Sequence, residues 1–417
     1  MGEFVVRGGR RLNGAVRING AKNASLPIMA ASLLTTRPVI IRDIPLIRDV
    51  LVMIEVLRSL GAKVEHHDRT LVIDTSHVQQ YRVPDALMQE MRASVFVMGP
   101  LLARLGRAEI VQPGGCAIGD RPIDLHLRGF EALGAKVSGN PSGTVVAADH
   151  LVGADIHLTF PSVGATENLI MAAALAHGET RIRNAAMEPE VVDLAQFLER
   201  MGVTVRGAGT PEIRVIGRGD LGGADHTVIP DRIETATFAL AVAATGGTVQ
   251  IDNCEPDHLP GLWGYLSEIG CDIVQDNDSV TLIAPDAYAP HSLTVHTGPY
   301  PGFATDIQAQ FMALLLKVPG IHVVSERVFE SRLGHAAEFR RLGAHIVADQ
   351  RVAIVYGGEV MYAGRVRAQD LRAGAALVIA GLQPSGETFI ANREVIERGY
   401  ENLDGRLRGL GADIISV

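Results

Sequence analysis

The sequence predicts an α/β protein of two similar domains, each built from three repeats of about 70 residues. The first observation is a segment that reads as the end of a helix, a glycine and a short apolar strand. It occurs at 57–64, 130–137, 198–205, 266–273, 339–346 and 407–414. The second is the spacing of its glycines, which is 73, 68, 68, 73 and 68 residues. The third is that each repeat has both helix and strand patterns, which favours closed clusters of repeats over a linear solenoid.

Each repeat begins with a helix that is apolar on most faces, and such helices are usually buried. These helices are expected at 24–34, 93–102, 166–176, 235–244, 307–316 and 373–381. A strand, a loop and a one-sided helix follow. In the first repeat Ile47, Val50, Ile54 and Leu57 have the i+3/i+4 spacing of one helix face. A glycine ends this helix because it adopts the left-handed conformation at little cost, and two strands complete the repeat.

Three repeats on each side divide the chain into residues 22–229 and residues 1–21 plus 230–417. The fourth repeat begins near 226–231, and the first crossing lies near Gly20 and Ala21. By repeat phase, the strands before Gly20 occupy the place that precedes a helix, so we expect them to complete the second domain. A cleft between the two domains is then the expected ligand site.

The composition excludes several classes of protein. With 47 Asp and Glu against 38 Lys and Arg, the net charge of −9 argues against nucleic-acid binding by bulk charge. No apolar run reaches the roughly 18 residues of a membrane span and no signal peptide is recognised, so we expect a cytoplasmic protein without membrane contact. The three cysteines form no disulfide or metal pattern, and no Walker loop or GxGxxG motif occurs. We therefore expect no metal and no cofactor, and we favour a monomer.

Basic residues recur at the starts of the buried helices. Lys22, Arg92, Arg232 and Arg372 occupy this position in four of the six repeats. A cation there opposes the helix dipole, which favours anions at the N-terminus, so stability alone does not select these residues. An anionic ligand at converging helix N-termini would reconcile the two, because backbone N–H groups and basic side chains would both bind it.

A second set of basic residues lies in the loops before the one-sided helices. The second repeat has a glycine-rich loop, 112–124, around Cys116 and Arg121, and a thiol beside cations in such a loop is expected to be reactive. The corresponding loops of the fifth and sixth repeats carry Arg332 and Arg398. If these loops face one cleft, two anionic substrates could bind between six basic residues. These are Lys22, Arg92, Arg121, Arg332, Arg372 and Arg398.

Each of these residues also has an ordinary structural interpretation. A single Arg or Lys near a loop is more often a solvated surface charge, and only the agreement in repeat phase favours a site. Cys116 could be a small apolar filler, which is what we expect of Cys254 and Cys271. Asp306 could be an N-cap or a first-turn acid of a helix. The histidines show no ligand spacing and are assigned to structure or surface: His66, His67, His126 and His335.

Over essentially the whole chain, the residues resemble the UDP-N-acetylglucosamine enolpyruvyl transferases (1-carboxyvinyltransferases), which catalyse the first committed step of peptidoglycan synthesis. The resemblance rests on Asn-Gly-Ala-Lys-Asn at 19–23 and on the loop motif at 114–125. Further matching motifs lie at 162–166, 230–235, 305–310, 370–372 and 398–401. The family implies a fold of two inside-out α/β barrels of three repeats each, with the active site in the cleft between them.

The resemblance also implies a reaction. The enolpyruvyl group of phosphoenolpyruvate passes to the 3-hydroxyl of UDP-N-acetylglucosamine, and phosphate leaves through a tetrahedral addition–elimination intermediate. Cys116 matches the family's proton donor, which also forms a covalent adduct, and it makes the chain an expected target of fosfomycin. Asp306 matches the residue at the sugar hydroxyl and is the candidate general base, and Asp370 assists proton handling. Lys22, Arg121 and Arg398 match the cations near the phosphate, and Arg332 and Arg372 match those near the carboxylate.

A further set matches positions that hold the UDP-sugar. It comprises Asn23, Arg92, Arg121, Pro122, Ile123, Asp124, Leu125, Ser162, Val163, Gly164, Asp306 and Val328. One departure stands out, because Phe160 replaces a lysine found in some family members. Neutralisation of the diphosphate is then left to Arg92 and Arg121.

Three other functions stay open at this point. A sister enolpyruvyl transferase acts on shikimate 3-phosphate and shares the six repeats and the basic cleft. A catalytically silent UDP-sugar-binding paralogue is the second, and a repeat protein with a purely structural role is the third. The Cys116 loop and the Arg-Pro-Ile-Asp-Leu sequence at 121–125 favour the UDP-sugar, and the set of Lys22, Cys116, Asp306 and Arg398 favours catalysis.

Overall fold

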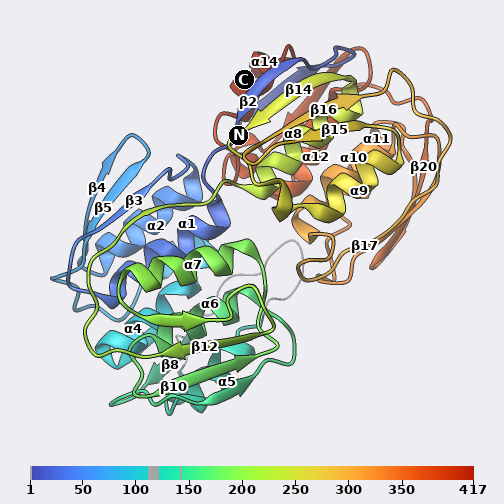
Figure 1. The fold of residues 1–417 in the computed structure, drawn as a ribbon. Helices are drawn as coiled ribbons and strands as arrows, with labels where there is room; N and C mark the ends of the chain where they lie inside the picture. Colours follow the sequence, from blue (N-terminus) through green and yellow to red (C-terminus); the bar gives the residue numbers. More distant parts are fainter. Residues whose placement is uncertain (1, 111–121, 141–142) are drawn as a thin grey trace. The chain divides into compact units, whose positions relative to one another are not determined.

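The structure, a computed structural model, describes residues 2–110, 122–140 and 143–417 as a mixed α/β protein (Figure 1). The described residues form two compact units. Residues 2–19 and 230–417 make up what we call the C-terminal unit, and the described residues from Gly20 to Ile229 make up the N-terminal unit. Each unit has a hydrophobic core of its own.

The N-terminal unit is built around the predicted apolar helices. Its helices are α1 (Lys22–Ala31), η1 (Ser32–Leu34), α2 (Arg48–Ser59), α3 (Asp85–Glu90), η2 (Arg92–Val97), α4 (Met98–Leu105), α5 (Asp124–Ala132), α6 (Val163–Ala173) and α7 (Pro189–Arg200). Helix α1 contacts η2 and α6, and α4 packs against α6. Nine of the ten residues of α1, nine of the eleven of α6 and five of the eight of α4 are buried, whereas α2 and α7 bury one face and expose the other.

Three sheets complete this unit within the described residues. Their strands are β3 (Val39–Arg42), β4 (Lys63–His67), β5 (Thr70–Asp74), β6 (Arg107–Ile110), β7 (Lys136–Asn140), β8 (Gly143–Ala147), β9 (Asp155–His157), β10 (Glu179–Arg183), β11 (Thr204–Arg206), β12 (Glu212–Ile216) and β13 (Asp225–Thr227). The strand orders are β13-β3-β5-β4, β6-β8-β7 and β11-β12-β10-β9. The last strand, β13, pairs in parallel with β3, so the third repeat of this unit returns to the first.

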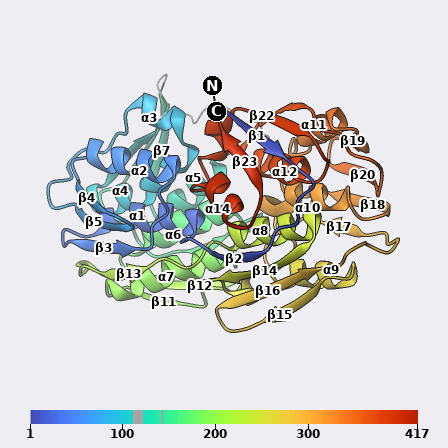
Figure 2. The ribbon, with the colours of Figure 1, turned by 90° about the horizontal axis from the view of Figure 1, so that it is seen from above.

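The C-terminal unit repeats this plan around α8, α10 and α12, each of which contacts the other two. Its helices are α8 (Arg232–Thr245), η3 (Pro256–His258), α9 (Pro260–Glu268), η4 (Thr305–Ile307), α10 (Gln308–Leu315), α11 (His335–Arg341), α12 (Leu371–Gly381), α13 (Arg393–Ile396) and α14 (Leu403–Gly409). Figure 2 shows α8, α10 and α12 in the middle of this unit, with strands on the outside.

Three four-stranded sheets surround these helices, in the orders β15-β16-β14-β2, β17-β18-β20-β19 and β21-β22-β1-β23. The strands are β1 (Glu3–Arg7), β2 (Gly14–Arg17), β14 (Gly247–Asp252), β15 (Asp272–Gln275), β16 (Ser279–Ala284), β17 (Thr294–His296), β18 (Gly320–Ser325), β19 (His345–Asp349), β20 (Val352–Gly357), β21 (Arg365–Arg367), β22 (Glu387–Ala391) and β23 (Asp413–Ser416). Both N-terminal strands belong here, since β2 pairs in parallel with β14 and β1 lies between β22 and β23.

The repeated glycine ends its helix in every repeat, as the sequence predicts. All six have φ between 89° and 104°: Gly61, Gly134, Gly202, Gly270, Gly343 and Gly411. In the first repeat the N–H of Gly61 donates to the carbonyl of Arg58 at 3.0 Å, and the next N–H donates to the carbonyl of Leu57 at 3.0 Å. The same pair of bonds recurs after each of the other glycines. This is the Schellman closure, which satisfies the last carbonyls of the helix and requires a left-handed residue.

Two glycine-to-alanine substitutions in the fourth repeat should change stability in opposite directions. A β-carbon at Gly270 or at Gly264 would meet no atom within 4 Å, so neither substitution causes a clash. Gly270 has φ of 99°, and Gly270→Ala should therefore destabilise the protein by about 1–2 kcal/mol. Gly264 lies inside α9, where Gly264→Ala should stabilise the protein by about 0.5–1 kcal/mol. Urea unfolding of both variants measures the effects, and equal shifts would contradict this account of the turn.

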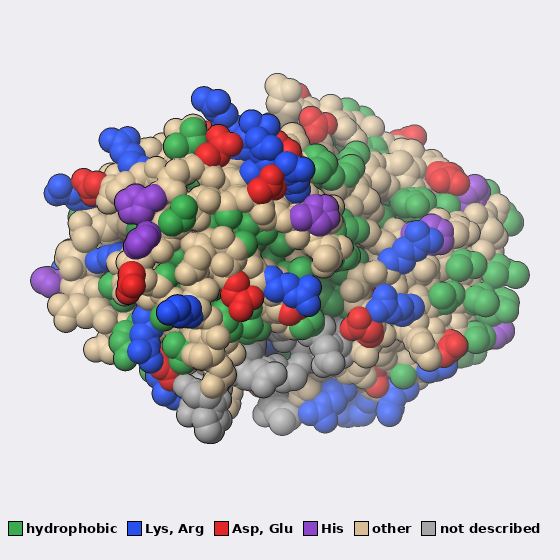
Figure 3. All heavy atoms as spheres, turned by 90° about the horizontal axis from the view of Figure 1, so that it is seen from below, with side chains coloured by type: hydrophobic (Ala, Val, Ile, Leu, Met, Phe, Trp, Pro, Cys, Tyr) green, Lys and Arg blue, Asp and Glu red, His purple; other side chains and the backbone are tan. Residues whose placement is uncertain are grey.

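Figure 3 shows one face of the molecule, on which acidic and basic side chains are interspersed among the residues drawn in colour. The net charge of −9 is therefore not gathered into a single acidic surface on the coloured part of this face. Across the described residues, no helix combines the length and the apolar character that crossing a bilayer requires.

Candidate active site

The predicted general base, Asp306, lies between two buried guanidinium groups in the C-terminal unit. Arg332 Nη2 donates to Asp306 Oδ1 at 2.8 Å, and Arg372 Nη2 donates to Asp306 Oδ2 at 3.1 Å. Asp306 sits in η4 just before α10, Arg372 starts α12, and Arg332 precedes α11. The arginine side chains are 6% and 4% exposed, but that of Asp306 is 25% exposed. The site is thus a carboxylate that is fixed on both oxygens and still reachable from outside.

Asp306 does not act as a helix cap. Neither η4 nor α10 has a side-chain cap at its N-terminus, and the Asp306 carboxylate is bound by Arg332 of the same repeat and by Arg372 of the next repeat. Asp306 is an acid in the first turn of η4, so this structural role and its place between two arginines are both present. Its two partners are 26 and 66 residues away in the chain, so only the fold brings them together.

Arg372 is held from several sides. Its guanidinium lies 5.4 Å from the centre of the Tyr400 ring, and its Nη1 atom is buried without a hydrogen bond to any described residue. Burial disfavours the charged form, but Tyr400, Asp306 and Asp231 outweigh it and raise the pKa of Arg372. The guanidinium therefore stays charged, and Nη1 is a donor that an anionic ligand could satisfy.

The remaining predicted residues of this unit lie on neighbouring segments. Asp370 caps α12, because its Oδ1 accepts from the N–H groups of Arg372 at 2.8 Å and Ala373 at 3.0 Å. Val328 is half-buried between β18 and α11. Arg398 is half-buried between α13 and α14, two residues before Tyr400. The segment that carries Arg398 thus also supplies the ring beside Arg372.

In the N-terminal unit, Lys22 starts α1 and is paired with an acid that the sequence analysis missed. Lys22 Nζ lies 2.8 Å from Asp49 Oδ2, and their side chains are 10% and 4% exposed. Asp49 comes from α2, which the sequence presents as a one-sided surface helix, so no local signal marks it. A buried ammonium needs such a partner to remain charged. Asn23 is half-buried next to it.

The predicted UDP-sugar segments of this unit are joined by Asn168, which the sequence analysis also missed. The Asn168 side chain accepts from the N–H of Gly99 at 2.9 Å and donates to the carbonyl of Val95 at 3.3 Å. Its Nδ2 also lies 3.1 Å from Nδ1 of His126 in α5. Asn168 belongs to α6, so one buried amide ties together the helical segments that follow Arg92, Asp124 and Ser162.

The other residues predicted for the UDP-sugar fall at the starts of helices. Ser162 caps α6 by accepting from the N–H of Ala165 at 3.4 Å, and Val163 and Gly164 begin that helix. Pro122 is exposed, and the three residues after it, Ile123, Asp124 and Leu125, are half-buried at the start of α5. Arg92 is the first residue of η2. Cys116 and Arg121 lie outside the described residues.

The cations at helix starts are confirmed in position, but the argument from the dipole needs a correction. Lys22, Arg92 and Arg232 are the first residues of their helices, and Arg372 is the second of α12. Asp231 and Asp370 cap α8 and α12 with the negative charge that the helix dipole favours. At the start of these two helices an acid that interacts favourably with the helix dipole therefore accompanies the cation. No anionic ligand is needed to explain why a cation is tolerated there.

The cysteines and histidines lie largely as predicted. Cys254 and Cys271 are buried, and burial raises the pKa of both thiols, that of Cys254 to about 11. They are inert fillers rather than nucleophiles. His126 and His335 are buried, whereas the side chain of His67 is 71% exposed.

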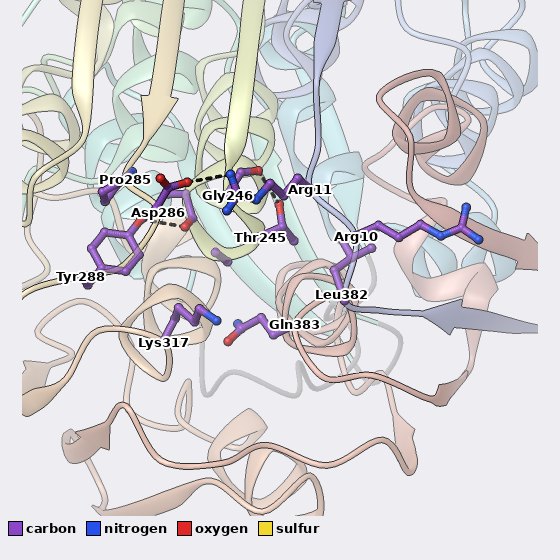
Figure 4. Close-up of a pocket in the computed structure, with 13 residues that line it drawn as sticks. Arg10, Arg11, Thr245, Gly246, Pro285, Asp286, Tyr288, Lys317, Leu382 and Gln383 are labelled. Atoms are coloured by element: carbon purple, nitrogen blue, oxygen red, sulfur yellow. Dashed lines mark hydrogen bonds and ion pairs between the residues drawn. The ribbon is translucent and has the colours of Figure 1, made fainter.

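A cavity of about 220 Å³ lies at the other ends of the three central helices of the C-terminal unit (Figure 4). The last residues of α8 and the residues that follow α10 and α12 line this cavity. Asp306 and Arg372, in contrast, lie at the starts of α10 and α12. Arg11 on its rim pairs with Asp286 at 2.7 Å, and Lys317 follows α10. Cations there stabilise helix C-termini, so we assign this cavity to the fold rather than to the predicted site.

His335 makes the stability of the C-terminal unit depend on pH. Burial lowers the pKa of His335 to about 4, while Asp370 raises it and Arg332 lowers it. Between pH 6.5 and 4 the unfolded chain binds a proton on His335 that the folded chain does not, so stability falls as the pH falls. His335→Gln removes this titration, and its stability deficit relative to the wild type should shrink by about 2 kcal/mol from pH 8 to pH 5.

Urea unfolding of both proteins at both pH values measures this change. His67→Gln, which alters a histidine whose side chain is 71% exposed, is the matched control for the substitution itself. A deficit of His335→Gln that does not change with pH would contradict the assignment of a buried neutral imidazole.

Comparison with known proteins identifies the class. A family-wide sequence profile described as EPSP synthase (3-phosphoshikimate 1-carboxyvinyltransferase) matches residues 6–407. The chain therefore belongs to this family of 1-carboxyvinyl, or enolpyruvyl, transferases. The crystal structure of the enolpyruvyl transferase NikO from Streptomyces tendae matches with a TM-score of 0.90 and 26% identity, over 100% of this chain and 99% of that one. EPSP synthase from Acinetobacter baumannii, at 16% identity and a TM-score of 0.77 over the full length of both chains, shows the fold alone.

Within the family, proteins named UDP-N-acetylglucosamine 1-carboxyvinyltransferase share about half of their residues with this chain. UDP-N-acetylglucosamine 1-carboxyvinyltransferase 2 of Carboxydothermus hydrogenoformans is 51% identical over 417 residues, which is 100% of both chains. UDP-N-acetylglucosamine 1-carboxyvinyltransferase of Finegoldia magna is 48% identical over 407 residues, which is 97% of this chain and 96% of that one.

Proposed function

We propose that this protein is a UDP-N-acetylglucosamine 1-carboxyvinyltransferase. It transfers the enolpyruvyl group of phosphoenolpyruvate to the 3-hydroxyl of UDP-N-acetylglucosamine and releases phosphate, in the first committed step of peptidoglycan synthesis. The observation that carries the proposal is the carboxylate of Asp306 held between Arg332 and Arg372 at helix starts of one unit. The full-length relatives at 48–51% identity support the choice of substrate.

We further propose that the two units are two inside-out α/β barrels of three repeats, residues 22–229 and residues 1–21 plus 230–417. Three buried helices in each unit, with sheets beside them, support this. On this proposal the active site is the cleft between the barrels, to which the first barrel contributes Lys22 and Asn23 and the second contributes Asp306. The protein acts in the cytoplasm, where its substrates are made, and as a monomer.

The roles of the residues follow from the chemistry of addition and elimination. Asp306 accepts the proton of the sugar 3-hydroxyl, and the oxygen then bonds to C2 of phosphoenolpyruvate. Cys116 donates a proton to the methylene carbon, which gives a tetrahedral adduct. Loss of a proton from the resulting methyl group then expels phosphate and restores the double bond. Asp370, two residues before Arg372 in the chain, assists this proton transfer.

Charge stabilisation is assigned to the basic residues. Arg332 and Arg372 neutralise the carboxylate of phosphoenolpyruvate, and the unsatisfied Nη1 of Arg372 supports this role. Lys22, Arg121 and Arg398 neutralise the phosphate that leaves. Fixed charges of this kind stabilise an anionic intermediate more than the ground state, because they need no reorganisation during the reaction.

The UDP-sugar is assigned to the segments that Asn168 ties together and to residues of the other unit. These residues are Asn23, Arg92, Arg121, Pro122, Ile123, Asp124, Leu125, Ser162, Val163, Gly164, Asp306 and Val328. Phe160 is 41% exposed beside this set, so it offers an apolar surface where some relatives of the family have a cation.

Phosphate release from phosphoenolpyruvate tests the proposal directly. The purified protein is incubated with UDP-N-acetylglucosamine, with shikimate 3-phosphate, or without acceptor. We expect stoichiometric phosphate and enolpyruvyl ether only with the UDP-sugar. Release only with shikimate 3-phosphate would favour the sister enzyme, and binding of the UDP-sugar without release would favour the silent paralogue.

A further inference from the structure

A buried carboxylate that plays no part in the proposed reaction lies behind Asp306. Glu326 follows β18 and has no exposed surface. Its Oε1 accepts from Thr297 Oγ1 at 2.9 Å, from the N–H of Val328 at 2.8 Å and from that of Phe329 at 3.1 Å. Its Oε2 accepts from Thr305 Oγ1 at 2.8 Å. Four donors from two segments therefore converge on one carboxylate.

We propose that Glu326 is a positioning residue for the transfer reaction. It acts through Thr305 and Arg332 and fixes the orientation in which Asp306 receives the proton of the acceptor hydroxyl. The inference rests on the proposed function, because it gives Asp306 the role of the base. Glu326 itself touches neither substrate in this account.

The chain of hydrogen bonds from Glu326 to Asp306 is continuous. Thr305 Oγ1, which donates to Glu326, accepts from Arg332 Nη1 at 2.8 Å. The other terminal nitrogen of Arg332 donates to Asp306 at 2.8 Å. Thr305 and Asp306 are consecutive residues of η4, so the chain closes on the segment from which it starts.

Glu326, at one end of this chain, fixes the direction of each hydrogen bond in it. An ionised carboxylate only accepts, whereas a hydroxyl has one proton to donate and lone pairs to accept. Glu326 therefore accepts a hydrogen bond from the Thr305 hydroxyl, and the Thr305 oxygen accepts one from Arg332. Nη1 of Arg332 is then occupied, and Nη2 is aimed at Asp306. A neutral group at position 326 would not impose this order.

The same carboxylate also shapes the loop that leads to Arg332. Its bonds to the N–H groups of Val328 and Phe329 fix the backbone just after β18. The Phe329 ring lies 5.1 Å from the Arg332 guanidinium. Glu326 thus holds Arg332 through the hydroxyl of Thr305 on one side and through the loop on the other.

The experiment compares Glu326→Gln with Glu330→Gln in the full-length protein. A glutamine that keeps its oxygen on the loop N–H groups turns its NH2 toward Thr305, so the Thr305 hydroxyl loses the acceptor of its proton and no longer has a fixed orientation. We expect kcat to fall about 10- to 100-fold, with KM for UDP-N-acetylglucosamine changed less than threefold. Glu330 lies in the same loop, pairs with Arg351 at 2.8 Å and is 57% exposed, so Glu330→Gln should keep the wild-type kcat.

A second pair of variants leaves Glu326 in place. Thr305→Val removes the hydroxyl and should lower kcat like Glu326→Gln, whereas Thr305→Ser keeps it and should restore kcat to within about threefold of the wild type. The double variant Glu326→Gln/Thr305→Val should lose less activity than the product of the two single losses, because both break one chain. Thr305→Val and Thr305→Ser also test the inference if Glu326→Gln does not fold.

Three results would overturn the inference while the proposed function stands. They are a kcat of Glu326→Gln equal to that of Glu330→Gln, an inactive Thr305→Ser, and independent losses in the double variant. Failure of the wild type to release phosphate with UDP-N-acetylglucosamine would instead reject the proposed function, so the two failures are distinguishable.

Discussion

Asp306→Asn should lower kcat about 1,000-fold, because an amide of the same size accepts no proton from the sugar hydroxyl. The substitution keeps one oxygen, which can accept from one of the two arginines, whereas the NH2 group cannot accept from the other. Binding of UDP-N-acetylglucosamine should weaken less than about tenfold, since an amide still forms hydrogen bonds with the sugar hydroxyl. Initial rates of phosphate release give kcat, and calorimetric titration gives the dissociation constant.

Asp286→Asn is the matched control for this prediction. Asp286 belongs to the same unit, pairs with Arg11 and is 85% exposed, so its loss should leave kcat within twofold of the wild type. If Asp306→Asn retained a tenth or more of the wild-type kcat, Asp306 would not be the base. A loss of UDP-sugar binding equal to the loss of kcat would assign Asp306 to binding alone.

Features with a local cause could be predicted from the sequence. The turn at the end of each one-sided helix requires a residue in the left-handed conformation, which favours glycine. All six turn glycines adopt this conformation. The buried helices follow from apolar residues on every face, and the structure places them within a few residues of the predicted ranges. Cys271 lies inside the repeated segment at 266–273, and both Cys254 and Cys271 are buried as expected.

The partners of the charged residues could not be predicted, because they come from distant segments. Asp49 pairs with Lys22 from a helix whose sequence suggests only a solvent-facing side. Asn168 sits in an apolar helix and bonds to segments about 40 and 70 residues away. Glu326 looks like any acid after a strand until the fold brings Thr305 to it. Only Asp231 and Asp370 had a usable local signal, the preference for Asp before the first turn of a helix.

Arg372→Lys should lower kcat/KM for phosphoenolpyruvate about 100-fold or more, although the positive charge is retained. Arg372 uses one terminal nitrogen on Asp306 and has a second, buried one without a described partner, while its plane lies against Tyr400. A lysine has a single nitrogen and no planar face, so it cannot bond to Asp306 and to a substrate carboxylate in this geometry. Each charged hydrogen bond lost costs about 1.5–3 kcal/mol, which sets the size of the effect.

Arg351→Lys provides the control, because Arg351 is 42% exposed and pairs with Glu330 outside the predicted site. It should leave kcat/KM unchanged, since exposed ion pairs contribute little. For Arg372→Lys the loss should appear mainly in the KM for phosphoenolpyruvate, while the dissociation constant of the UDP-sugar changes little. A loss confined to UDP-sugar binding would instead mean that Arg372 serves the sugar nucleotide. A variant with wild-type kcat/KM would show that charge alone suffices at this position, and that the unsatisfied nitrogen has no role in substrate binding.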